Sequence, residues 1–238
     1  MHEPDTTTRR DFVERLATSA IALGFGAAAA PAAAFAATST VDETIAAQKW
    51  DNSWLNGIKG NHAQIFDMPA PNGGFGLLHV QNYIDTYKDA LGVAYPKALA
   101  IVSLYGMTTP LGFSDAMWAK YHFGDVLKVN DRTTKAVALR NVFAAAGMAG
   151  APLGADYAFE IPGTSSIASL QSRGVRFILC NNALSFWVAR IAAGSGGNAT
   201  TIRNDLLANM LPKVVLVPAM VIAFNQAQTA GASYMFLT

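Results

Sequence analysis

Apolar residues follow two patterns along the chain from about residue 60 onward. Short continuous apolar runs are typical of strands buried on both faces. They predict strands at His62–Asp67, Lys97–Tyr105, Val175–Cys180, Val214–Pro218 and Ser233–Leu237. Apolar residues three and four positions apart predict helices between these runs, at Leu77–Leu91, Ser114–Tyr121, Ser165–Arg173, Asn181–Gly194, Ala199–Met210 and Val221–Ala230. This alternation predicts a three-layer α/β domain with a mostly parallel sheet.

Two segments lack these patterns. Residues 37–60 read as an irregular N-terminal arm, with Trp50 and Trp54 as its anchors on the domain. Residues 123–163 are rich in Gly, Ala and Pro and show no clear period. Long unpatterned segments inside compact domains are often functional, so this stretch is predicted to be an insertion that acts as a lid or an interface loop. The α/β domain as a whole is predicted to span residues 61–238.

The first 36 residues have the three parts of an export signal. A polar region carries Arg9 and Arg10, an Ala- and Gly-rich apolar stretch follows, and Ala34-Phe35-Ala36 has the small-x-small pattern of a cleavage site. Paired arginines before a weakly apolar stretch resemble a twin-arginine signal. We expect residues 1–36 to be cleaved and the protein to act in the periplasm. The alternative is that the segment stays attached as a membrane anchor.

Charge and motif content narrow the partners and cofactors. The chain has 17 Lys+Arg and 16 Asp+Glu without a basic cluster, which argues against nucleic acid or an anionic membrane surface as partner. No apolar run after the signal reaches membrane-spanning length, so no membrane contact is expected after cleavage. His62, His79 and His122 lack zinc-ligand spacing, so no metal is expected. We also expect no cofactor, because the chain has no flavin or nicotinamide motif; an enzyme loaded with a cofactor before export is the least supported alternative.

Cys180 is the only cysteine, so no intrachain disulfide can form, and it is the main chemical candidate. It ends a predicted strand and precedes a predicted helix, whose first N–H groups and dipole favour a thiolate. Asn181 and Asn182 follow it and are predicted to donate further hydrogen bonds to an anionic sulfur or a sulfur oxyanion. The simpler alternative is that Cys180 is a small buried core residue.

Other binding residues are predicted beyond the ends of the strands. Ligands of parallel sheets sit at the carboxyl edge, so the loop Tyr105-Gly106-Met107 after the second strand is a candidate. Arg140, in the middle of the unpatterned segment, is a candidate for an oxyanion.

The segment around the cysteine resembles that of the DsrE-like proteins of the sulfur-relay group. The likeness rests on Gly174-Val175-Arg176-Phe177-Ile178-Leu179-Cys180-Asn181-Asn182-Ala183-Leu184 and on the order strand, helix, strand that follows from Leu211 to Met235. The resemblance implies a flavodoxin-like sheet of five strands and a homo-oligomer. It also implies that Cys180 carries a persulfide and passes the sulfur on.

Two functions follow from these observations. In the first, Cys180 takes sulfur from a small sulfur compound such as polysulfide or thiosulfate and delivers it to a sulfur-acceptor protein. In the second, the protein is a non-catalytic module that binds a small anion or a partner beneath residues 123–163, and Cys180 is structural and buried.

Overall fold

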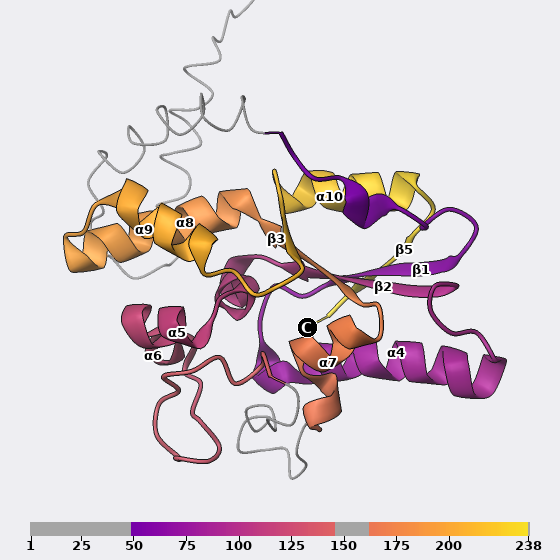
Figure 1. Ribbon diagram of the computed structural model, residues 1–238, viewed down its shortest axis with the longest axis horizontal. Helices are drawn as coiled ribbons and strands as arrows, with labels where there is room; N and C mark the ends of the chain where they lie inside the picture. The colour runs from indigo at the N-terminus through magenta and orange to yellow at the C-terminus, as the bar shows by residue number, and fades with distance from the viewer. Residues whose placement is uncertain (1–48, 146–161, 238) are drawn as a thin grey trace, which may run out of the picture. The chain divides into compact units, whose positions relative to one another are not determined.

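A parallel sheet of five strands forms the centre of the computed structural model, which describes residues 49–145 and 162–237 (Figure 1). The strands are β1 His62–Asp67, β2 Ala98–Leu104, β3 Arg176–Cys180, β4 Val214–Val217 and β5 Ser233–Phe236. Their order across the sheet is β4-β3-β2-β1-β5, and every neighbouring pair is parallel. The predicted three-layer α/β class is confirmed. The strand order differs from the 2-1-3-4-5 order of flavodoxin itself.

Helices connect successive strands. They are α4 Phe75–Leu91, α5 Asp115–Tyr121, α6 Phe123–Leu127, α7 Ile167–Ser172, α8 Asn181–Ser195, α9 Ala199–Ala208 and α10 Met220–Thr229. Single turns of 3-10 helix are η2 Ser53–Leu55, η3 Asn72–Gly74 and η5 Gly163–Ser165, and a longer one is η4 Gly106–Gly112. The chain divides into the units Met1–Ala46 and Ala47–Thr238; the export signal predicted for residues 1–36 lies outside the described residues.

Several helix limits differ from the prediction by one or two residues, including the end of α8 and the start of α5. Helix α8 was predicted to end at Gly194 but continues to Ser195, and Gly196 ends it in the left-handed conformation with φ 68°. A glycine ends a helix when its backbone takes positive φ, and a glycine in helical conformation costs only about 1 kcal/mol. Ser114 precedes α5 as predicted, but its hydroxyl is buried without a hydrogen-bond partner and does not cap the helix.

Each face of the sheet packs against its own set of elements (Figure 1). The α4-side core combines sheet residues with α4, α7, α8 and α9, and includes Leu77, Leu170, Leu184 and Leu206. The α10-side core combines the opposite sheet face with η2 and α10, and includes Trp54, Ile65, Ile178, Met220 and Ala223. Strand β2 is buried along its whole length, which explains its continuous apolar run.

The described part of residues 123–163 alternates between exposed positions and residues buried in the protein interior. It begins with α6 and continues as irregular chain joined by an isolated antiparallel bridge between Asn130 and Val137. Val142 and Phe143 are 2% and 1% exposed within the α4-side core. Residues 146–161 lie outside the described part, so the predicted lid role of the full segment stays a prediction.

Strand β5 is the edge of the sheet next to β1. All four of its residues are exposed, and Phe236 is 52% exposed. Among the described helices, none has both the length and the apolar character needed to cross a membrane.

Candidate functional site at the carboxyl edge of the sheet

Cys180 lies at the topological switch point of the sheet. The chain leaves β3 for α8, whose Trp187 packs in the α4-side core, but leaves the neighbouring β4 for α10, whose Met220 packs in the α10-side core. Cys180 is the last residue of β3 and is level with Val217 of β4. Open α/β sheets bind ligands beyond the carboxyl ends of the strands at such a point.

The Cys180 sulfur accepts hydrogen bonds from the first turns of two helices. The backbone N–H of Ala183 in α8 lies 3.4 Å from Sγ, and the backbone N–H of Met220 in α10 lies 3.3 Å from it. First-turn N–H groups have no partner within their own helix and carry the positive end of its dipole. The sulfur therefore lies where the positive ends of two helices meet. Cys180 itself is 5% exposed.

Three more polar residues reach the same face and the same edge. Successive side chains of a strand point to opposite faces. Asp67 ends β1 in phase with Ile65 of the α10-side core, and Tyr105 follows β2 and packs against that core. Tyr234 of β5 contacts Phe224 of α10 with ring centroids 5.5 Å apart. We call Asp67, Tyr105, Cys180 and Tyr234 the carboxyl-edge cluster.

Asp67 is the centre of the polar contacts in this cluster. It is 4% exposed, its Oδ2 accepts a hydrogen bond from the Tyr234 hydroxyl, and its Oδ1 is buried without a hydrogen-bond partner. Burial, the hydrogen bond to Asp67 and the negative charge of Asp67 raise the pKa of Tyr234 to about 12. Burial also raises the pKa of Tyr105 far above its usual range, with further contributions from Asp67, Tyr234 and Cys180. Both phenols therefore stay protonated at neutral pH and serve as hydrogen-bond donors to Asp67.

The predicted loop Tyr105-Gly106-Met107 is fixed at this edge by backbone contacts. The N–H of Met107 donates to the Pro69 carbonyl at 2.9 Å, and Nε1 of Trp187 in α8 donates to the Gly106 carbonyl at 2.8 Å. Gly106 has φ 56°, a conformation that favours glycine. The structure thus brings this loop and the start of α8, two predicted parts of the site, to adjoining positions.

The two asparagines after Cys180 differ in their surroundings. Asn181 is fully buried, and its Oδ1 accepts a hydrogen bond from Nη2 of Arg203 in α9. Asn182 is exposed. The hydrogen bonds to the Cys180 sulfur come from backbone groups, whereas the side chain of Asn181 turns to α9.

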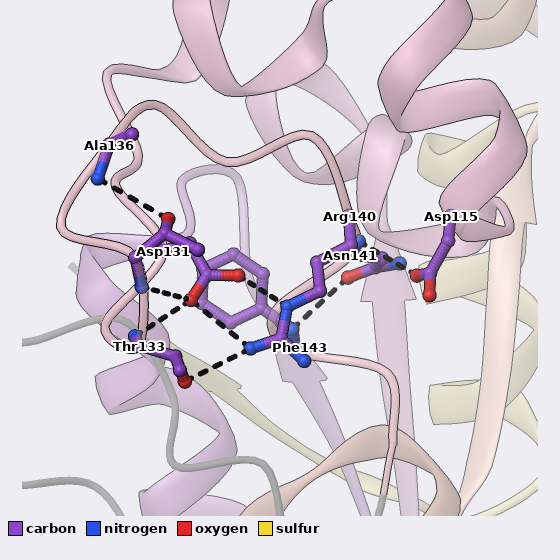
Figure 2. A network of polar contacts seen from close by, with 8 residues as sticks. Asp115, Asp131, Thr133, Ala136, Arg140, Asn141 and Phe143 are labelled. Carbon is purple, nitrogen blue, oxygen red and sulfur yellow. Dashed lines mark hydrogen bonds and ion pairs between the residues drawn. The ribbon is translucent and has the colours of Figure 1, made fainter.

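Arg140 is part of a different polar network (Figure 2). Its guanidinium donates to both carboxylate oxygens of Asp131 and, at 3.4 Å, to the Thr133 hydroxyl. The backbone N–H of the neighbouring Asn141 donates to Oδ1 of Asp115 in α5 at 2.9 Å. The structure therefore places Arg140 in the network that holds the segment after α6, and not in the carboxyl-edge cluster.

Sequence reasoning missed several residues of this region, although two of them carry a signal. Asp67 stands in the phase of Ala63 and Ile65 at the carboxyl end of a strand, which places a carboxylate on a buried face. Tyr234 has no such signal, because its contact with Asp67 depends on β5 pairing with β1. The helix predicted to start after Pro218 gave a weak indication that free N–H groups, such as that of Met220, lie at the end of the preceding strand. Among the described residues, no group of three His, Cys, Asp or Glu side chains is arranged to hold a metal ion.

Comparison of the chain with protein-family models, curated proteins and solved structures finds no match. The resemblance to DsrE-like proteins therefore rests on the segment around Cys180 and on the order of the elements after it. Any function for the chain has to be argued from the geometry of the carboxyl-edge cluster.

Proposed function

We propose that the protein is an exported sulfur carrier that holds sulfane sulfur as a persulfide on Cys180. The observation that carries the proposal is the pair of backbone N–H groups, from Ala183 and Met220, that converge on the Cys180 sulfur. A thiolate is the form that attacks a sulfur electrophile, and the two N–H groups supply hydrogen bonds to the attacking sulfur. The DsrE-like segment and the twin-arginine pattern support the same proposal, with the periplasm as the proposed location.

The proposed reaction is a displacement on sulfur that needs no other reactant. The Cys180 thiolate attacks the outer sulfur of thiosulfate, the S–S bond of thiosulfate breaks, and sulfite leaves with the electron pair. The product is a persulfide anion on Cys180, and the total charge is unchanged. With a polysulfide the same attack releases a chain one sulfur shorter. Because Cys180 is only 5% exposed, the donor has to be a small species of this kind.

The remaining cluster residues have roles that follow from their contacts. Tyr105 is a phenol that burial and its hydrogen bond to Asp67 keep protonated, so it adds no negative charge beside the sulfur. Asp67 holds the Tyr234 hydroxyl and thereby fixes the edge strand β5 beside the site. Delivery of the sulfur to an acceptor protein is the second half of the proposed function.

Mass spectrometry of the intact protein tests the proposal. After treatment with thiosulfate or polysulfide, we expect wild-type protein to gain the mass of one sulfur atom on Cys180, and a reductant to remove it. The Cys180→Ser variant should gain nothing. A wild-type protein that gains no sulfur, and whose thiol is alkylated only after unfolding, would contradict the proposal.

The burial of Cys180 supports a second candidate function, in which the protein binds a small anion or a partner without covalent chemistry. A cysteine that is 5% exposed and fills a position in the α10-side core is also what a structural cysteine looks like. Under this alternative, Cys180→Ser should leave ligand binding and oligomer size unchanged. Sulfur uptake by the wild-type protein therefore separates the two candidates.

A further inference from the structure

Arg203 in α9 is a charged side chain that the proposed sulfur chemistry does not use. It is half-buried, and burial lowers its pKa. Its hydrogen bonds go to neutral oxygens: Nη2 donates to Oδ1 of Asn181, and Nη1 lies 3.4 Å from the Ser185 hydroxyl. No carboxylate of the described residues pairs with it. Burying a charge without a counter-ion is costly.

Asn181 also has a polar group without a partner. Its Oδ1 is occupied by Arg203, whereas its Nδ2 is buried and has no hydrogen-bond acceptor. A guanidinium has five N–H donors, and two contacts account for the bonds that Arg203 makes. Unused donors on two adjacent side chains, one of them charged, lie beside the first turn of α8. The Arg203 charge, the unpaired Asn181 Nδ2 and the first turn of α8 would each be satisfied by a negatively charged hydrogen-bond acceptor.

We propose that Arg203 and Asn181 form a binding site for a small oxyanion between α8 and α9. The ligand class is a tetrahedral or planar anion such as sulfate, thiosulfate or phosphate, which accepts several hydrogen bonds at once. Ser185 lies one turn after Asn181 and adds a hydroxyl donor. The site does not depend on a reactive thiol: the anion is held by charge and hydrogen bonds from α8 and α9, whereas the Cys180 sulfur is in the α10-side core.

Isothermal titration calorimetry with sulfate, thiosulfate and phosphate tests the site on the full domain, with chloride at matched ionic strength as reference. We expect saturable binding of at least one oxyanion to wild-type protein. Arg203→Met should weaken it by about tenfold or more, as expected when one charge-assisted hydrogen-bond partner is lost. Arg190→Met is the matched control, because Arg190 is an exposed arginine on the same helix pair, and it should bind like wild type.

Three further variants keep the test decisive. Arg203→Lys retains the charge, so it should fold and bind with intermediate affinity even if Arg203→Met does not fold. Asn181→Asp supplies a carboxylate to Arg203 within the protein and should abolish anion binding while the protein stays folded. Cys180→Ser should bind the anion normally, which separates this site from the sulfur proposal. Absence of saturable binding in wild type, or an equal loss in Arg190→Met, would overturn the inference.

Discussion

Asp131 is the residue whose charge state depends most clearly on one neighbour. Its carboxylate is buried, whereas the Arg140 guanidinium beside it is partly exposed (Figure 2). The hydrogen bond from Arg140 lowers the pKa of Asp131 from 3.8 to about 2, with backbone N–H groups of Thr133 and Thr134 acting in the same direction. The folded protein therefore favours the ionised form. Its contribution to stability is complete above pH 3.8 and is lost as the pH falls towards 2.

We expect Asp131→Asn to lower the free energy of unfolding by about 1–3 kcal/mol near neutral pH, because Arg140 loses its buried partner. The difference from wild type should stay constant down to about pH 4 and shrink between about pH 4 and about pH 2, as linkage requires. Urea unfolding at several pH values measures it. Asp125→Asn is the control, because Asp125 is exposed and its contact with His122 is long, at 3.8 Å. This variant should change the free energy of unfolding little. If the loss of unfolding free energy in Asp131→Asn did not change with pH, the effect would come from altered packing and not from the lost charge.

Part of the candidate site could be predicted residue by residue. Cys180 and the Tyr105 loop were found because each follows a continuous apolar strand, and β2 and β3 turn out to be neighbours. Arg203 was not found, since its charge resembles that of any helix-surface arginine until α8 and α9 are seen to pack. Arg140 was predicted as an oxyanion ligand, and its ion pair with Asp131 was not foreseen, because eight residues of irregular chain separate the two.

At the scale of elements, Gly124 is the residue of α6 that packs against the irregular segment that follows. A Cβ added there would lie 2.2 Å from the Ala138 carbonyl oxygen and 2.9 Å from the Ala138 nitrogen. These are backbone atoms of the residue after Val137, which is bridged to Asn130. The backbone of Ala138 would therefore have to shift to make room for an added Cβ. The close approach explains why a short helix with a glycine in its first turn can hold this segment in place.

We expect Gly124→Ala to destabilise the protein by about 1–3 kcal/mol, the usual cost of forcing extra atoms into a packed interior. Gly194→Ala is the matched control, because Gly194 lies in α8 with nothing within 4 Å of an added Cβ. It should be neutral or stabilising by up to about 1 kcal/mol through helix propensity. Thermal unfolding of both variants measures the difference. Equal melting temperatures for the two would show that the contact with Ala138 is loose.

The elements with a strong period were predictable, and those held by tertiary contacts were not. Strand β1 has the predicted limits, because a turn on either side bounds its apolar run. The segment after Tyr121 gave no period, since its buried residues Val129, Ala138 and Phe143 are spaced by the path of the chain over the α4-side core. Such spacing belongs to neither a helix nor a strand. The strand order could not be predicted either, because the apolar pattern indicates the elements but not which strands are neighbours.

At the scale of the whole molecule, β5 leaves one side of the sheet open. It pairs with β1, and no described strand pairs with its other side. Tyr234, Met235 and Phe236 are 43%, 38% and 52% exposed along it. An exposed apolar edge is a template for another strand. We therefore propose that the homo-oligomer implied by the resemblance forms through β5 of two copies.

Analytical ultracentrifugation of the wild type and of Phe236→Lys tests this contact. We expect the lysine to dissociate the oligomer, because a charge on an edge strand opposes pairing. Phe186→Lys is the control, since Phe186 is 62% exposed on α8, and it should sediment like the wild type. A wild-type monomer, or equal dissociation by both variants, would contradict an interface at β5.

The place of β5 beside β1 also has a consequence for the order of events during synthesis. Gln64 is level with Ser233, so the two strands that meet at this edge are made far apart in time. A chain leaving the ribosome can build β1 to β4 and their helices first, because those contacts are closer in sequence, and long-range pairings form late. The bond between Tyr234 and Asp67 is then among the last to form. Until β5 emerges, Asp67 lacks its hydroxyl donor, so the carboxyl-edge cluster is completed only after β5 has been made.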